Sequence, residues 1–287
     1  MSKAAFFAGR VAVIATMHRK ETAIAPLVEA AWGVKTRVPA EFDTNRFGTF
    51  TRETKRPADQ LTTARLKAEA ALDLTGETLA IASEGSFGPH PQIPFIASNR
   101  ELVLLCDRQQ QLEIVGECLS TQTNYQSQTI CSLEEALAFA ESVGFPQHGL
   151  VVMPTADNNP SDAIFKGITT EARLAAAVEQ ALEQAPDRKA HIETDMRALY
   201  NPTRMEAIAQ ATQDLIRLVE QRCPQCDCPG FRIVKHNPGL PCGLCRTPTL
   251  LTLSVLYRCQ RCQFEQHQFF PNSLQFADPG QCPYCNP

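Results

Sequence analysis

Four closely spaced cysteine pairs near the end of the chain constrain its fold more than any other feature. Each has the pattern Cys-x-x-Cys, and together they supply eight thiols. Such a pair can place two thiolates on one side of a tight turn, and two pairs complete the tetrahedral sulfur shell that zinc prefers. The sequence therefore predicts a zinc-ribbon module with two structural Zn²⁺ ions. The expected metal ligands are Cys223, Cys226, Cys242, Cys245, Cys259, Cys262, Cys282 and Cys285.

The spacing leaves open which pairs share an ion. The intervals between successive pairs contain 15, 13 and 19 residues, and all three suit ribbon loops. The first expectation is that neighbouring pairs share an ion in sequence order. In a nested alternative, the middle pairs share one ion around the strand-like run 251–257, and the outer pairs share the other. Cys228 is a ninth thiol that can replace Cys226. Because four thiolates leave no open coordination position, neither ion should be catalytic.

A disulfide framework is the competing explanation for these cysteines, and it requires an oxidising compartment. The first 15 residues contain only short apolar runs, interrupted by Arg10. They resemble neither a signal peptide nor a membrane span. We therefore expect a cytoplasmic protein of bacterial type with no membrane partner. The net charge of −4 argues against broad electrostatic binding of nucleic acid, although a local basic patch escapes this count.

Hydrophobic patterns ahead of the cysteines predict an α/β body. The apolar runs 10–16 and 79–82 are typical of central strands covered on both faces, and 101–106 with 112–120 indicates a hairpin. Segments with apolar residues at helical spacing lie between and after these strands. The expected fold is a three-layer α/β body with a mixed central sheet, followed by a helix and the small zinc-ribbon module.

This organisation divides the chain into three segments. A body spans residues 1–188, an acidic strand with a connecting helix spans 189–222, and the ribbon module spans 223–287. The helix should begin at Asn201-Pro202, because asparagine caps helices well and proline fits their first turn. Residues 186–189 are the expected hinge between the body and the C-terminal part of the chain.

Polar residues follow the two central strands and form a candidate ligand site. Thr16 and Lys20 belong to a turn between the first strand and a helix, an arrangement that can hold an anion. Glu84-Gly85 follows the second run, where open α/β sheets bind ligands, and glycine permits close backbone approach. The alternative is two surface turns with solvated charges.

The segment His191–Arg197 is a second candidate. If it is extended, His191, Glu193, Asp195 and Arg197 share one face. An imidazole, two carboxylates and a guanidinium in a line suit a divalent cation or a phosphate. The alternative is an exposed edge strand with paired surface charges, which would contribute little to stability.

Several short motifs resemble a bacterial family described only as a domain of unknown function. That resemblance covers the whole chain but implies no activity. Besides the cysteine pairs, its marks are Gly48–Thr51, Ser83–Pro91, Glu193–Ala198 and Asn201–Met205.

The order of elements over residues 10–185 resembles the inosine triphosphate pyrophosphatase superfamily of nucleotide hydrolases. The resemblance implies that fold for the body. It also implies that Lys20 and Lys67 offset phosphate charge, and that Glu84 is a catalytic carboxylate at the position of the second acidic residue of a pair. Thr16, Arg65 and Arg197 are further candidates for binding the ligand. The matching positions are Ala15, Thr16, Lys20, Ala64, Lys67, Ala68 and Ala82–Ser86, together with the hairpin 101–120.

The chain departs from that superfamily in its acidic residues. Ser83 stands in place of the first acid of a pair, and Thr62 or Thr63 stands where a glutamate is usual. The remaining Mg²⁺ ligands would have to come from Glu53, Asp59, or the carboxylates of Glu193 and Asp195.

Two functions are consistent with these patterns. The first is a Mg²⁺-dependent hydrolase of a nucleotide or another small phosphate ester, in which the carboxylates orient metal and water. The second is an adaptor without catalysis, in which the ribbon module contacts nucleic acid or a protein. Neither the substrate nor the oligomeric state is specified. The adaptor's expected contacts are the basic Arg222, Arg232, Lys235, Arg246, Arg258 and Arg261, with Phe231, Tyr257 and Phe264 for stacking.

Overall fold

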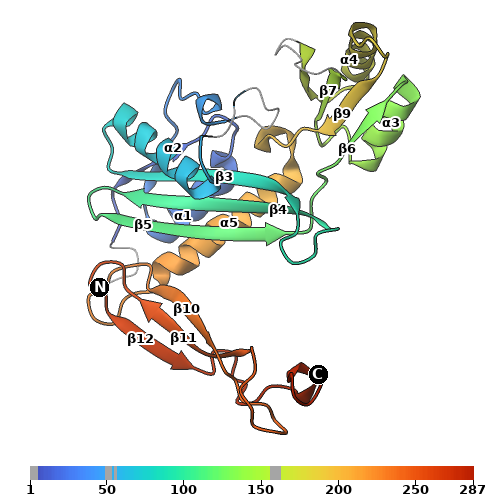
Figure 1. Cartoon of the computed structure of the whole chain (residues 1–287). Helices are drawn as coiled ribbons and strands as arrows, with labels where there is room; N and C mark the ends of the chain where they lie inside the picture. The colour runs from blue at the N-terminus through green and yellow to red at the C-terminus, as the bar shows by residue number, and fades with distance from the viewer. Residues whose placement is uncertain (1–5, 49–53, 55–56, 156–162) are drawn as a thin grey trace. The chain divides into compact units, whose positions relative to one another are not determined.

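The chain folds into two compact units, Met1–Leu215 and Ile216–Pro287. The computed structural model in Figure 1 describes residues 6–48, 54, 57–155 and 163–287. No helix within these described residues combines the length and the apolar character needed to cross a membrane.

A mixed sheet of five strands forms the centre of the first unit. The strands are β1 (Val11–Ala15), β2 (Lys35–Arg37), β3 (Leu79–Pro89), β4 (Ala97–Asp107) and β5 (Leu112–Ser120). Their order is β2-β1-β3-β4-β5. The first three are parallel, and β4 and β5 are antiparallel to their neighbours. The mixed central sheet expected from the sequence is confirmed, and the runs 10–16 and 79–82 lie at two of its central positions.

Helices cover both faces of this sheet and complete three layers. They are α1 (Glu21–Trp32), α2 (Gln60–Thr75) and α5 (Pro202–Glu220). Small residues of α2, such as Ala64 and Ala68, pack on Ala82 and Leu104 of the sheet. On the other face, Gly116 of β5 lies directly against the backbone of α5. Figure 1 shows α2 on one side of the sheet, with α1 and α5 on the other.

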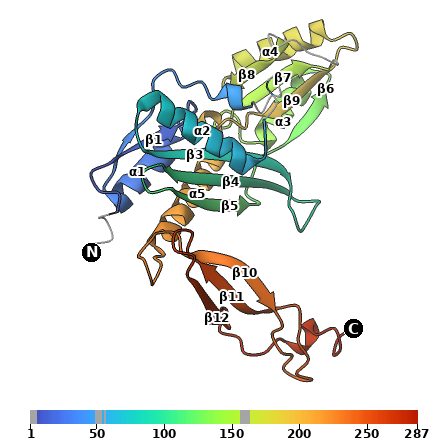
Figure 2. The same cartoon turned by 60° about the vertical axis from the view of Figure 1, so that its left-hand side comes forward.

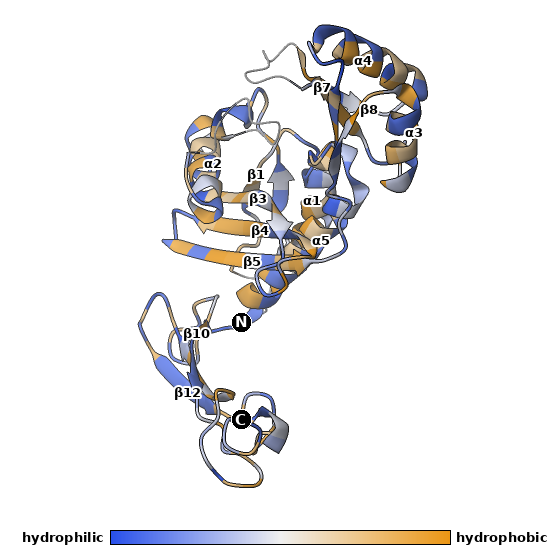
Figure 3. Cartoon of the chain, turned by 45° about the vertical axis from the view of Figure 1, so that its right-hand side comes forward, coloured by the Kyte–Doolittle hydropathy of each residue, from blue (hydrophilic) through white to orange (hydrophobic). Residues whose placement is uncertain are grey.

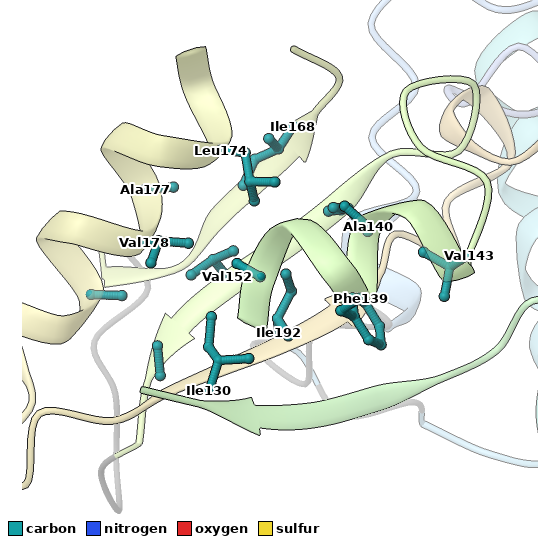
Figure 4. Packing of buried hydrophobic residues seen from close by; sticks show 14 residues of the cluster. Ile130, Phe139, Ala140, Val143, Val152, Ile168, Leu174, Ala177, Val178 and Ile192 are labelled. Atoms are coloured by element: carbon teal, nitrogen blue, oxygen red, sulfur yellow. The ribbon is translucent and has the colours of Figure 1, made fainter. Parts of the chain in front are cut away.

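The first unit also contains a second, antiparallel sheet that the sequence did not predict. Its order is β6-β9-β7-β8. Its side chains and those of two helices form a separate apolar core around Ile130, Val152 and Ile192, seen in Figure 4. The elements are β6 (Ser127–Ile130), α3 (Leu133–Ser142), β7 (Leu150–Pro154), β8 (Phe165–Ile168), α4 (Glu171–Gln184) and β9 (Ala190–Thr194).

Side-chain caps explain where three of these helices begin. Asp59, Ser132 and Thr170 precede α2, α3 and α4, and each accepts hydrogen bonds from backbone N–H groups of the first turn. Such caps satisfy donors that have no partner within the helix. The start of α5 after Asn201 agrees with the sequence prediction.

The second unit is built around a three-stranded antiparallel sheet. Its strands are β10 (Arg232–Pro238), β11 (Thr252–Arg258) and β12 (Glu265–Phe269). The central strand is β11, and the cysteine pairs lie in the turns and loops outside these strands.

Candidate functional site

The carboxyl end of β1 is the point where the strand order of the five-stranded sheet reverses. The chain leaves β1 along α1 to reach β2 on one side, and then crosses the opposite face along α2 to reach β3 on the other side (Figure 2). Ligands of open α/β sheets bind at such switch points. Here β1 ends at Ala15, which pairs with Ala82, whereas β3 continues to Pro89. Residues 83–85 therefore extend beyond the end of β1.

Side chains around this end of β3 alternate between the two faces. Glu84 points to the face covered by α2, and Ser83 and Gly85 point to the face covered by α1 and α5. The register pairs Gly85 with Glu101 of β4, which places the Glu101 side chain on the α5 face. A Cβ atom at position 85 would lie 2.2 Å from the Glu101 carboxylate, so any other residue here would displace the side chains of Glu101 and Arg204.

Three helices each bring one buried cation to this point. Lys67 of α2 forms an ion pair with Glu84. From the opposite face, Arg204 of α5 donates through Nε to Glu101 Oε1 at 2.7 Å. Lys20, at the start of α1, donates to the carbonyl and the hydroxyl of Ser83, both at 3.2 Å. We call these six residues the switch-point cluster: Lys20, Lys67, Ser83, Glu84, Glu101 and Arg204.

The cluster has a positive electrostatic potential near Lys20. Burial, and then the charges of Arg204 and Lys67, lower the pKa of Lys20 to about 7, although Glu101 and Glu84 act in the opposite direction. His18, in the same turn, is partly buried, and this burial with the surrounding cations lowers its pKa to about 3. At neutral pH the imidazole is therefore uncharged. An anion bound here would favour the protonated forms of both groups.

Two other predicted ligand-binding residues have different surroundings. Thr16 is buried in the turn after β1, where its hydroxyl oxygen accepts a hydrogen bond of 3.2 Å from the backbone N–H of His18. Arg65 lies on a part-exposed surface and pairs with Glu113 at 2.8 Å. Glu113 pairs with Cys106 of β4, whereas Glu84 pairs with Leu102 of the same strand. These two positions are about four residues, or roughly 13 Å, apart along β4. Arg65 does not join the cluster, because its side chain leaves α2 toward β5.

The predicted row of four polar side chains from 191 to 197 is wrong. β9 ends at Thr194, and only His191 and Glu193 share its partly exposed face, where His191 Nε2 and Glu193 Oε2 lie 3.3 Å apart. Asp195 turns inward and accepts the Gly167 N–H at 3.0 Å as well as bonds from Arg197. Arg197 is nevertheless close enough to the cluster for its charge to lower the pKa of His18.

The described carboxylates that the sequence suggested as Mg²⁺ ligands already have other partners. Glu84 and Asp195 each face a cation, and Asp59 is used as the cap of α2. Glu53 lies outside the described residues. Within the described chain, the groups of three or more His, Cys, Asp or Glu that can hold a metal consist of cysteines alone.

Glu101 and Arg204 were not predicted as site residues, although the local sequence around each indicates a buried charge. Glu101 begins the apolar run 102–106, where a buried carboxylate requires a partner. Arg204 occupies the same helical stripe as the buried Ile208, Ala211 and Leu215, because residues four or seven apart share a face. Their separation of 103 positions hides the pairing itself.

The cysteines of the second unit form two groups of four whose pairing differs from both predictions. The first pair joins the third, and the second joins the fourth, so that the two sites interleave along the chain. Consecutive sharing and nested sharing are therefore both wrong. The groups are Cys223, Cys226, Cys259 and Cys262, and Cys242, Cys245, Cys282 and Cys285.

The sulfur geometry of both groups suits a tetrahedral metal. Four contacts between the pairs measure 3.6 to 3.8 Å. Sulfurs at the corners of a tetrahedron, each about 2.3 Å from a central zinc, are about 3.8 Å apart. Cys228 belongs to neither group, because its Sγ lies against the Pro229 carbonyl at 3.5 Å. All twelve cysteines, every one of them described, are free of disulfides.

The sequence profile of a family described as a domain of unknown function (DUF6671) matches residues 67–287. The matched segment includes Glu84, Glu101 and Arg204 as well as all eight paired cysteines, but begins after β1 and Lys20. No curated protein matches the chain.

Proposed function

The chain belongs to the DUF6671 family, and because that description carries no activity, we propose a function from the geometry of the switch-point cluster. The first unit binds a nucleotide or another small phosphate ester at the carboxyl end of β1 and hydrolyses it. The observation that supports this most is Lys20: it is buried among other cations, yet its hydrogen bonds to described residues go to the neutral Ser83 alone.

A phosphate group would supply the missing counter-charge. Lys67 and Arg204 already face Glu84 and Glu101, so Lys20 is the cation that gains most from an added anion. Cations placed where negative charge develops stabilise the transition state of phosphoryl transfer. The turn 16–20 also leads into the N-terminus of α1, whose backbone dipole favours an anion.

His18 is the proposed general base. Its pKa of about 3 is set partly by Lys20, Arg197 and Arg204. A bound phosphate offsets these charges and brings the pKa toward the range in which a base works at neutral pH. A water oxygen then forms its bond to phosphorus while the bond to the leaving oxygen breaks, and the imidazole accepts the water's proton. Mg²⁺ belongs to this proposal only as a companion of the substrate's phosphates.

Zinc is the proposed metal of both four-cysteine groups. Four thiolates at tetrahedral spacing are the ligand set of structural zinc sites, and these closed shells leave no position for a substrate. Thiols remain reduced in the cytoplasm, which is the proposed location. The two zinc ions therefore hold the fold of the second unit.

A screen of nucleoside triphosphates and small phosphate esters, with Mg²⁺ and with EDTA, tests the proposed hydrolase. We expect phosphate release with at least one compound, lost in Lys20→Met. Lys35→Met is the matched control, because Lys35 is an exposed lysine on β2 of the same sheet. The proposal fails if no compound is hydrolysed or bound, or if both variants lose activity equally.

A further inference from the structure

The sheet of the second unit carries its charged side chains on one face only. Register places Arg232 beside Arg258, and Arg258 beside Glu265. The next row holds Lys235 and His267 on either side of the buried Leu256. We call this the basic face: Arg232, Lys235, Arg258, Glu265, His267 and Phe269.

Side-chain contacts agree with this assignment. Arg258 pairs with Glu265 at 2.6 Å, and the rings of His267 and Phe269 stack with centroids 6.5 Å apart. Such contacts require side chains on the same side of the sheet. Figure 3 shows β12 largely in the hydrophilic colour.

The opposite face has a different composition. Across β10, β11 and β12, all of which the structure describes, that face holds no Lys, Arg, Asp or Glu. Three cations and one carboxylate thus give the basic face a net charge of 3 − 1 = +2, in a chain with a net charge of −4. The positive charge is therefore local to this surface. The opposite face consists of Ile233, His236, Leu253, Val255, Tyr257, Gln266 and Gln268.

An exposed aromatic ring lies among these charges. Phe269 is 60% exposed, so its ring is open to solvent beside the cationic side chains. By contrast, the aromatic residues predicted to stack on bases form an internal group: Phe231 is buried and stacks on Tyr257 and Phe264 at 5.4 and 6.0 Å. The exposed aromatic rings of the basic face therefore lie on β12.

We propose that the basic face binds single-stranded nucleic acid. Arg232, Lys235 and Arg258 contact backbone phosphates, and unpaired bases stack on Phe269 and His267. Proteins that bind single strands combine a cationic track with aromatic platforms in this way, whereas a duplex keeps its base faces covered. This site lies wholly in the second unit and is independent of the proposed hydrolase.

Fluorescence anisotropy of a labelled single strand of about 16 nucleotides, titrated with the full zinc-loaded chain, tests the proposal. We expect the single strand to bind more tightly than its duplex. Phe269→Ala should weaken binding by at least about fivefold, the lower end of base-stacking effects. Gln268→Ala, its neighbour on the opposite face, is the matched control and should bind like the wild type. Zinc content and circular dichroism confirm that both variants fold.

Salt dependence gives a second readout. Contacts with three phosphates predict a slope of about −2 for the logarithm of affinity against the logarithm of salt concentration, and Lys235→Ser should reduce its magnitude by about 0.7. Equal binding of duplex and single strand, or equal losses in Phe269→Ala and Gln268→Ala, would overturn the proposal. Absence of binding to every oligonucleotide would also overturn it.

Discussion

Arg204 and Glu101 show how strongly single residues determine the local structure of the first unit. Their side chains are 1% and 0% exposed, and the guanidinium also donates to the Met196 carbonyl. Removing two charges from water is costly, so a buried pair is tolerated only when each charge has its partner and its remaining hydrogen bonds. The cluster therefore depends on a contact between β4 and α5.

Arg204→Met should lower the free energy of unfolding by about 3–5 kcal/mol, because it leaves the Glu101 carboxylate buried without its cation. Urea denaturation measures this change. The control is Arg100→Met, which breaks an ion pair with Glu117 whose side chains are half-exposed, and we expect a loss below about 1 kcal/mol. Adding Glu101→Gln to Arg204→Met should recover part of the loss. Similar effects of the two arginine substitutions would contradict this account.

Lys20 should make phosphate binding depend on pH. In the free protein its pKa is about 7, and a bound anion raises it. At about pH 6 the amine is already protonated, whereas at about pH 8 the complex must take up nearly one proton, so affinity falls as pH rises. Calorimetry in buffers of different ionisation enthalpy measures this uptake with the compound found in the screen. Uptake that persists in Lys20→Met would assign the proton to another group.

At the scale of elements, the contact between β5 and α5 depends on one glycine. A Cβ atom on Gly116 would lie 2.2 Å from the Leu215 nitrogen and 2.3 Å from the Ala211 carbonyl, both backbone atoms of α5. Backbone atoms cannot move aside as the end of a flexible side chain can, so α5 would have to shift from the sheet.

Gly116→Ala should destabilise the first unit by about 1–3 kcal/mol or more, the usual cost of overpacking. Gly88→Ala is the matched control within the same sheet, because a Cβ there meets no atom within 4 Å. Thermal unfolding of the two variants provides the comparison. A melting temperature for Gly116→Ala equal to that of Gly88→Ala would show that α5 does not pack as described.

Elements with strong local signals were predictable from the sequence. The helix α4 (Glu171–Gln184) is an example, because its apolar residues recur at helical spacing and Thr170 caps its first turn. The run 79–82 was recognised as a strand, but β3 continues to Pro89. Glu84 and Gly85 had been compatible with a polar surface turn. Instead Glu84 pairs with Lys67 of α2, and Ser83 accepts hydrogen bonds from Lys20, contacts with distant parts of the chain that local patterns do not contain.

The second sheet was not predictable for a related reason. An apolar run such as 149–153 indicates a buried strand but does not say which sheet it joins. Here the pairing of β7 with β8 and β9, and the packing of α3 and α4, create a core separate from that of the five-stranded sheet. Long-range pairing decides this arrangement.

At the scale of the whole molecule, the cysteine pattern identified the ligands but not their pairing. All eight predicted residues belong to the two groups, since Cys-x-x-Cys is itself a local signal. The interval lengths are compatible with any pairing. The antiparallel register of β10, β11 and β12 brings distant pairs together, which results in the interleaved arrangement.

Metal content of cysteine variants tests the interleaved pairing. Replacing the first and third pairs together with serine removes only one of the two sites, so about one zinc per chain should remain. Consecutive or nested sharing would place one of these pairs in each site, and both ions would then be lost. Elemental analysis of the reduced protein distinguishes these outcomes, with the wild type at about two ions per chain as the reference.

The central claim is that an anion binds at the switch-point cluster, and the position of tungstate, a phosphate mimic, tests it most directly. Anomalous scattering from a crystal of the protein grown with tungstate locates the ion without prior assumption. We predict the ion beside the turn 16–20 and the end of β1, with a tungstate oxygen within about 3.2 Å of Lys20 Nζ, and its loss in Lys20→Met. Tungstate bound elsewhere while the cluster keeps its present contacts, or an equal signal in Lys20→Met, would contradict the account.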